Sequence, residues 1–134
     1  MLTVGDRLKD FQFTGVRPGA ISPDDAFVAV NDASFSEGEF KGKWKVLVFY
    51  PKDFTFVCPS EILAFEHRYD EFKKRNVEVI AVSVDSQFSH LAWKNTPVEK
   101  GGLGKVRFPI VADLTKQIAR DYDVLLGGAV ALRG

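Results

Sequence analysis

The sequence predicts an α/β domain in which helices pack on a central mixed sheet. A continuous apolar run at residues 46–49 and a largely apolar segment at 77–84 have the length and composition of buried strands. An amphipathic helical pattern separates them, and strand and helix patterns continue to alternate towards the end of the chain. At 134 residues the chain has the length of one domain with its own core. We therefore expect residues 1–134 to form a single domain.

The first forty residues are rich in turn signals. Short apolar pieces are separated by Pro18-Gly19, by residues 22–25 and by Asn31-Asp32. Residues 11–14 and 27–30 are predicted to be short strands at a sheet edge.

The first long strand is predicted over residues 44–50. The unbroken apolar run at residues 46–49 within it is typical of a strand buried on both faces. A helix is predicted from Pro59 to about Arg75, because apolar residues recur at spacings of three and four: Ile62, Phe65, Tyr69 and Phe72. Pro59 suits the first turn of a helix, and Asn76 is the predicted stop.

The second half of the chain repeats this alternation. The predicted elements, in order, are a strand at 77–84, a helix at 86–95, a glycine loop at 101–104, a strand at 108–112, a helix at 114–122 and the start of a strand at 130–132. The glycine loop fits no phosphate-binding spacing, and we interpret it as a flexible connector. A strand that has barely begun at the last residue is typical of a truncated domain, so we expect its C-terminal part to be missing.

The bulk composition excludes several classes of function. Lys plus Arg and Asp plus Glu both number 18, so the net charge gives no reason to expect nucleic acid or an acidic membrane as a partner. A single cysteine cannot form an internal disulfide, and no signal peptide or membrane-spanning run is visible. The expected location is the cytoplasm.

Cys58 is the only cysteine and lies where the first long strand gives way to a helix. The positive end of a helix and its unpaired N–H groups favour an anion, and hence a thiolate. A lone cysteine is more often a small buried hydrophobe. Here Pro51, Asp53 and Thr55 before it, and the Pro-Ser pair after it, are typical of turns and helix caps, which favours a functional thiol.

Other cysteine chemistries fit the sequence less well. There is no C-x-x-C pair for dithiol exchange, and one cysteine with two histidines makes a tetrahedral zinc site improbable. We expect both histidines, His67 and His90, to face solvent or to serve on a helix face.

The run from Phe49 to Glu61, FYPKDFTFVCPSE, closely resembles the peroxidatic motif of the peroxiredoxins, in their alkyl hydroperoxide reductase C and typical 2-Cys branch. Residues 90–97, 101–104 and 131–134 are similar to further segments of that family. The resemblance implies a thioredoxin-like fold. It also implies reduction of hydrogen peroxide and organic hydroperoxides by the Cys58 thiolate, which becomes a sulfenic acid, with no metal, haem or flavin in this chain.

The resemblance also implies roles for the residues around Cys58. Arg133 would supply positive charge, because its rigid fork of donors suits a thiolate and a peroxide oxygen together. Thr55 and the Cys58 N–H would donate to the peroxide. Pro51 would shield the thiolate from water, and Glu61 would orient Arg133 by a charge-assisted hydrogen bond. Trp93 is expected to be a packing residue.

The chain departs from the family's pattern because it has no second, resolving cysteine. Either the resolving cysteine lies in a missing C-terminal segment, or a partner supplies the thiol. A thiol reductant protein, such as thioredoxin or an alkyl hydroperoxide reductase flavoprotein, would complete the cycle. Relatives form homodimers and rings of dimers, with contacts near Phe54. Two alternatives stay open, a redox-inactive thioredoxin-fold module with an interaction or holdase role, and a peroxide sensor that passes its oxidation to a partner.

Overall fold

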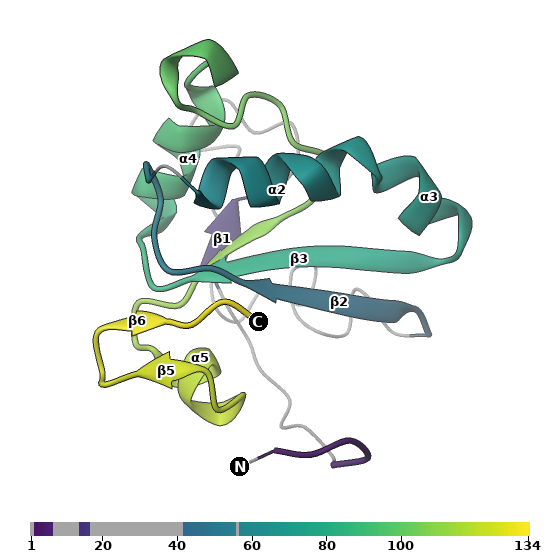
Figure 1. Ribbon diagram of the computed structural model, residues 1–134, viewed down its shortest axis with the longest axis vertical. Coiled ribbons are helices and arrows are strands. Elements are labelled where there is room, and N and C mark those ends of the chain that lie inside the picture. The colour runs from purple at the N-terminus through teal and green to yellow at the C-terminus, as the bar shows by residue number, and fades with distance from the viewer. Residues whose placement is uncertain (1, 7–13, 17–41, 56) are drawn as a thin grey trace.

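A four-stranded sheet crosses the described part of the chain, and helices lie on both sides of it (Figure 1). The computed structural model describes residues 2–6, 14–16, 42–55 and 57–134. The elements, in chain order, are β1 (Thr14–Val16), β2 (Trp44–Phe49), α2 (Cys58–His67), α3 (Tyr69–Lys74), β3 (Val77–Ser83), α4 (Gln87–Asn95), η3 (Val98–Lys100), β4 (Ile110–Ala112), α5 (Gln117–Asp121), β5 (Leu125–Leu126) and β6 (Val130–Ala131).

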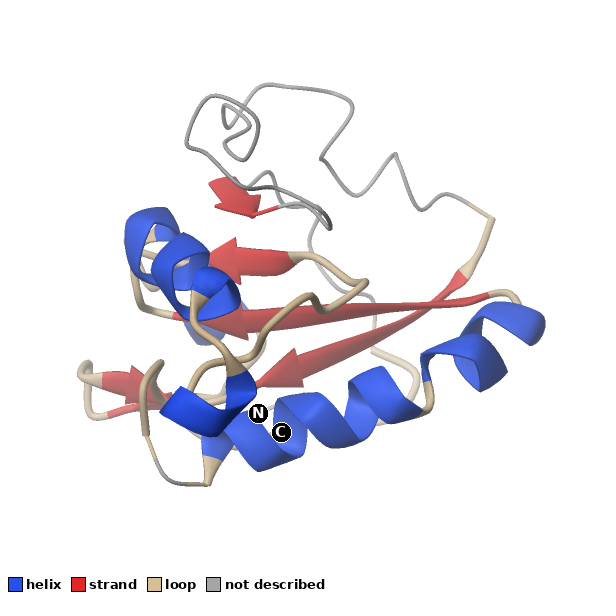
Figure 2. Ribbon diagram, turned by 90° about the horizontal axis from the view of Figure 1, so that it is seen from above, coloured by secondary structure: helices blue, strands red, loops and turns tan. Residues whose placement is uncertain are grey.

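The sheet is mixed and has the strand order β1-β4-β3-β2 (Figure 2). β2, β3 and β4 are parallel, with Trp44 opposite Val77 and Ala81 opposite Ile110. β1 pairs antiparallel with β4. β5 and β6 form a separate antiparallel hairpin. This confirms the predicted α/β class with a mixed sheet.

Alternate residues of β3 divide the core between the two faces of the sheet. Val79 and Ala81 belong to a cluster with Ile62 of α2 and Trp93 of α4, whereas Ile80 and Val82 belong to a cluster with other elements, including Ile118 and Ala119 of α5 and Ala131 of β6. A strand presents successive side chains to opposite faces, so the apolar run of β3 needs cover on both. Figure 1 shows α2 and α3 on one side of the sheet and α5 with the hairpin on the other.

Several predicted elements are confirmed. β2 and β3 follow the predicted strands to within a residue, and α4 begins after Ser86, whose hydroxyl accepts a hydrogen bond from the Ser89 N–H at 3.1 Å. Asn76 ends α3 with a φ of 57°. The N-terminal strand prediction at 27–30 lies outside the described residues, whereas that at 11–14 reaches β1 only at Thr14.

The single helix predicted over 59–75 is wrong, because α2 and α3 are separated at Arg68. Arg107, from the segment before β4, donates to the Glu66 carbonyl at 3.3 Å and to the Glu66 and Asp70 carboxylates at 2.6 and 3.0 Å. The Glu66 carbonyl would otherwise accept the next helical hydrogen bond, from Asp70. A side chain distant in sequence therefore competes with the helix at this point.

Three smaller expectations are corrected. β2 is the edge of the sheet and its side chains are mostly half-buried, not buried on both faces. The predicted helix at 114–122 shortens to α5, because Lys116 has a φ of 61° and cannot continue a helix. The predicted flexible glycine loop is instead packed, with Gly102 and Leu103 buried and the Trp93 indole N–H donating to the Gly101 carbonyl at 3.1 Å.

Candidate functional site

Cys58 is the first residue of α2 and is almost fully buried, with 1% of its surface exposed. Val57, the residue before it, has no side chain able to cap the helix, and the Ser60 hydroxyl bonds back to the Val57 carbonyl at 2.7 Å. Pro59 lies in the first turn, as predicted. The sulfur thus lies at the positive end of a helix whose first N–H groups have no intrahelical acceptor.

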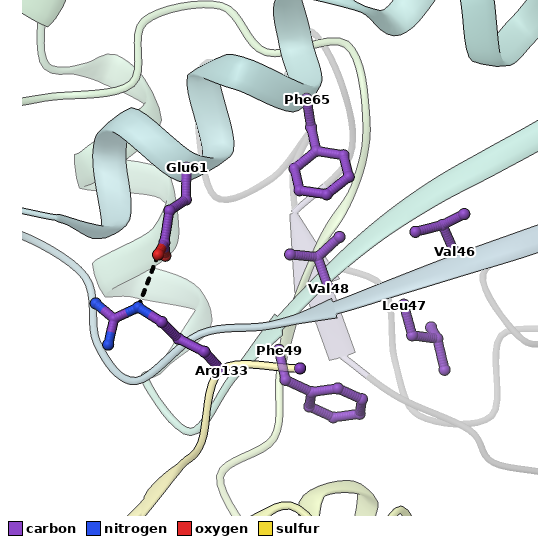
Figure 3. A pocket seen from close by; sticks show the side chains of 8 residues that line it. Val46, Leu47, Val48, Phe49, Glu61, Phe65 and Arg133 are labelled. Carbon is purple, nitrogen blue, oxygen red and sulfur yellow. Dashed lines mark hydrogen bonds and ion pairs between the residues drawn. The ribbon is translucent and has the colours of Figure 1, made fainter.

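Arg133 reaches this sulfur from the far end of the sequence. Its Nη2 lies 3.8 Å from Cys58 Sγ, and its Nε donates to Glu61 Oε1 at 2.7 Å. Figure 3 shows the Arg133 guanidinium directed at Glu61. Glu61 lies three residues after Cys58 in α2. The predicted hydrogen bond between Glu61 and Arg133 is therefore confirmed.

The backbone around Arg133 is fixed by pairing with β2. Phe49 N donates to the Gly134 carbonyl at 2.7 Å, and Gly134 N donates to the Phe49 carbonyl at 3.3 Å. Leu132 N donates to the Val124 carbonyl at 2.7 Å. These bonds hold the residues on both sides of Arg133, so the guanidinium is delivered to a defined place.

Thr55 and Pro51 lie on the segment that joins β2 to α2. Thr55 is exposed, and its hydroxyl donates to the Lys52 carbonyl at 3.1 Å. Within the described ranges no hydrogen bond joins Thr55 to Cys58, and the expected role of Thr55 as a donor to the peroxide stays a prediction. Pro51 is half-buried. The structure thus brings Cys58, Arg133 and Glu61 into direct contact and leaves the other two residues on the adjoining loop.

A buried polar network underlies this loop, and sequence reasoning missed it. His90 was expected on a helix face or facing solvent, yet it is fully buried, with Nδ1 2.7 Å from Asp53 Oδ2 and Nε2 3.0 Å from the Val111 carbonyl. Tyr50 donates its hydroxyl to Asp53 Oδ1 at 2.6 Å. The available signal was the position of His90 one residue before Leu91 and three before Trp93, on the apolar face of the helix. His67, in contrast, is exposed as expected.

The protonation of Tyr50 follows from this network. Burial, and then the negative charge of Asp53, raise the pKa of the Tyr50 hydroxyl well above its ordinary value of 10.0. The hydroxyl therefore stays protonated and remains a donor to the carboxylate.

A pocket of about 340 Å³ opens beside Arg133. It is lined by residues 46–49 of β2, by Glu61 and Phe65 of α2, and by Arg133 and Gly134 (Figure 3). Its walls are mainly apolar, and the Arg133–Glu61 pair is its charged part. Cys58 does not line this pocket. Arg133 lines the pocket and also contacts the Cys58 sulfur, so it links the two.

Comparison with known proteins places the chain in a family. Residues 4–134 match the AhpC/TSA family. The chain is 63% identical over 89 residues to alkyl hydroperoxide reductase C of Helicobacter pylori, an alignment covering 66% of this chain and 45% of that protein. It is also 63% identical over 97 residues to the mitochondrial thioredoxin-dependent peroxide reductase of Homo sapiens, covering 72% of this chain and 38% of that protein.

Solved structures agree with this assignment. The reduced 2-Cys peroxiredoxin of Plasmodium vivax superposes with a TM-score of 0.83 at 42% identity, covering 97% of this chain and 74% of that one. The chain belongs to the AhpC/TSA family and has the thioredoxin-like α/β fold of its peroxiredoxin relatives. It spans about half the length of the curated relatives that it matches. No helix among the described residues is long and apolar enough to cross a membrane.

Proposed function

We propose that this chain carries the peroxide-reducing site of a thiol-dependent peroxidase, with Cys58 as the reacting residue. The observation that carries the proposal is the buried Cys58 sulfur at a helix N-terminus, 3.8 Å from a guanidinium that is itself held by Glu61. Helix and guanidinium both favour negative charge at the sulfur. The family's named members, alkyl hydroperoxide reductase C and thioredoxin-dependent peroxide reductase, support the same reaction.

The proposed step is a displacement at oxygen. The Cys58 thiolate attacks the terminal oxygen of a hydroperoxide, a sulfur–oxygen bond forms, and the oxygen–oxygen bond breaks. The electron pair of the broken bond leaves with the second oxygen, which takes up a proton and departs as water or an alcohol. Sulfur is oxidised to a sulfenic acid and the peroxide is reduced.

The surrounding residues would act on the charge that spreads from sulfur to oxygen. Arg133 would donate to the sulfur and to the oxygen under attack, while Glu61 keeps its fork in place. The Thr55 hydroxyl and the Cys58 N–H would donate to the peroxide, and Pro51 would limit the access of water.

A second thiol is needed to return Cys58 to its reduced form. The 134 residues hold no other cysteine, so the sulfenic acid would condense with a thiol from outside them, releasing water and forming a disulfide. A thiol of a reductant protein would then break this disulfide and release Cys58. The name of the human relative supports thioredoxin as this partner. A reducing compartment such as the cytoplasm would supply it.

The proposal is tested by following hydrogen peroxide consumption with a thiol reductant. The parent chain should consume peroxide and Cys58→Ser should not. Alkylation of Cys58 by iodoacetamide at neutral pH gives a second measure, since only the thiolate reacts. A parent that consumes peroxide no faster than Cys58→Ser, and is alkylated as slowly as free cysteine, would contradict the proposal and favour a redox-inactive module.

The role of Thr55 has its own test. Thr55→Val removes the hydroxyl and keeps the shape of the side chain. We expect the rate of Cys58 oxidation to fall by about a hundredfold, the usual effect of losing one preorganised donor at a transition state. Oxidation at the parent's rate would remove Thr55 from the mechanism.

A further inference from the structure

The turn that precedes Cys58 is docked on α4 through two adjacent side chains. Asp53 and Phe54 are its central residues, and the Thr55 hydroxyl closes it on the Lys52 carbonyl. Asp53 meets His90, and the Phe54 ring lies 6.0 Å from the Trp93 ring. His90 and Trp93 are three residues apart, so one face of α4 receives both side chains.

Both carboxylate oxygens and the backbone N–H of Asp53 are engaged in this docking. Its carboxylate accepts from Tyr50 and faces His90 Nδ1, and its backbone N–H donates to Asp85 Oδ2 at 2.8 Å. The Val111 carbonyl can only accept, so His90 Nε2 carries a proton. One further proton lies between His90 Nδ1 and Asp53 Oδ2, and together these bonds fix both the ring and the carboxylate.

The turn has a conformation that needs such support. Phe54 has a φ of 54°, a left-handed backbone that bulky L-residues rarely adopt and that persists only where the surroundings enforce it. The bonds of Asp53 on one side and the ring contact with Trp93 on the other are the enforcing contacts. The residue after Phe54 is Thr55, and Cys58 follows within the same connection.

We propose that the buried Asp53–His90 pair is a positioning device for peroxide reduction, which holds the turn so that Thr55 is presented to the oxygen attacked by Cys58. This inference rests on the proposed function. Neither residue touches the sulfur, so both act through the turn. Near-attack geometry is sensitive to displacements of about 1 Å at a distance from the reacting atoms, which can cost up to a hundredfold in rate.

The test compares two reactions of Cys58 in the full 134-residue chain. Oxidation by hydrogen peroxide depends on the turn under this proposal, whereas alkylation by iodoacetamide depends only on the thiolate and its access. Asp53→Asn and His90→Gln should slow oxidation by about tenfold to a hundredfold and leave alkylation within about twofold. The double variant, a neutral amide pair, should recover part of the loss.

Tyr50→Phe is the variant that keeps the test decisive if the buried substitutions prevent folding. It removes a single donor to Asp53 and retains the ring contacts with Trp93 and His90. We expect oxidation to slow by about tenfold, the effect of losing one hydrogen bond to a charged carboxylate. Tyr122→Phe deletes the same group on the opposite face of the sheet, next to Phe49, and should change neither rate.

Three results would overturn the positioning role. They are oxidation at the parent's rate in folded variants, loss of oxidation and alkylation in step, and equal effects of Tyr50→Phe and Tyr122→Phe. A parent chain that is alkylated but not oxidised faster than free cysteine would instead contradict the proposed function itself.

Discussion

At the scale of single residues, the site depends on a cation held in place by one carboxylate. Arg133 is half-exposed, and an exposed long side chain samples many rotamers unless a partner selects one. Glu61 provides that selection from the same helix that begins with Cys58. Glu61 holds the arginine and Cys58 reacts, and the two lie within one turn of the same helix. Their relative positions are therefore fixed.

Glu61→Gln should therefore weaken the hydrogen bond that holds Arg133 while keeping the shape of the side chain. The amide can still accept from Arg133 Nε, but the bond loses its charge assistance, a difference of about 1 kcal/mol or more. We expect the rate of Cys58 oxidation by peroxide to fall by about tenfold, measured under single-turnover conditions. Glu78→Gln, which removes the charge from the acceptor of the Lys43–Glu78 surface pair at 2.8 Å, is the matched control and should leave the rate unchanged. Equal rates in the two variants would contradict the role of Glu61.

The titration of Lys94 should affect how the free energy of unfolding depends on pH. Lys94 is 5% exposed, and burial lowers the pKa of its ammonium group from 10.5 to about 8. The negative charge of Glu66 opposes this shift. Below pH 8 the ammonium is present in both states, so folding carries the full cost of burying it. Between pH 8 and 10.5 the folded state releases the proton while the unfolded state keeps it, and stability rises with pH.

Lys94→Met should accordingly raise the free energy of unfolding at pH 7 by roughly 2 kcal/mol, since one pKa unit corresponds to about 1.4 kcal/mol and repacking offsets part of the gain. The advantage over the parent should shrink as pH rises from 8 to 10.5 in urea denaturation series. Lys100→Met, at an exposed position, should stay within about 0.5 kcal/mol of the parent. A constant difference across this pH range would refute the assignment.

At the scale of elements, the sequence pattern predicted those helices and strands whose bounds are set by residues close in sequence. β3 and α4 were predicted nearly to the residue, because an apolar run and a serine cap act within a few positions. The break between α2 and α3 was not, because Arg107 competes for a helix carbonyl from 41 residues away. The buried bonds of His90 were not predicted for the same reason, since its partners Asp53 and Val111 are 37 and 21 residues distant.

The glycine loop after α4 has two positions where the structure favours glycine. A Cβ built on Gly102 would lie 1.9 Å from the Thr96 carbonyl oxygen, whereas one on Gly101 would meet no atom within 4 Å. Gly101 does have a φ of 83°, which disfavours other residues by about 1 kcal/mol. The two neighbouring glycines are thus required for different reasons.

Gly102→Ala should destabilise the fold far more than Gly101→Ala. The contact is with backbone that cannot rotate away, so we expect a loss of about 3 kcal/mol or more, against about 1 kcal/mol for Gly101→Ala. Urea denaturation of the two variants gives the comparison directly. Similar losses would mean that the Thr96 backbone relaxes freely, contrary to the close packing of this loop.

At the scale of the whole molecule, the site exists only when distant parts of the chain have met. Arg133 and Cys58 are 75 residues apart, and their contact depends on the pairing of Phe49 with Gly134 at the end of β2. No periodicity in the sequence indicates this pairing. The resemblance to the peroxiredoxins predicted the residues of the contact, whereas the hydrogen bonds that produce it required the structure.

The surface near the site also carries exposed apolar side chains. Phe54, at the turn, is 52% exposed, and Phe88, in the first turn of the helix that receives the turn, is 61% exposed. Large exposed apolar side chains are typical of contact surfaces between proteins. Phe88 lies two residues before His90 and five before Trp93, so it faces away from the side chains that receive the turn. We propose that copies of the chain associate through this outer face of α4.

Phe88→Lys should therefore shift the chain towards smaller species in sedimentation velocity at micromolar concentration. Lysine is tolerated on a helix surface, so the fold should be unaffected, while burying its charge in a contact between copies is costly. Leu114→Lys, at a 54% exposed position beyond β4, is the matched control and should leave the distribution unchanged. If Phe88→Lys sediments as the parent does at every concentration, the outer face of α4 is not part of a contact between copies.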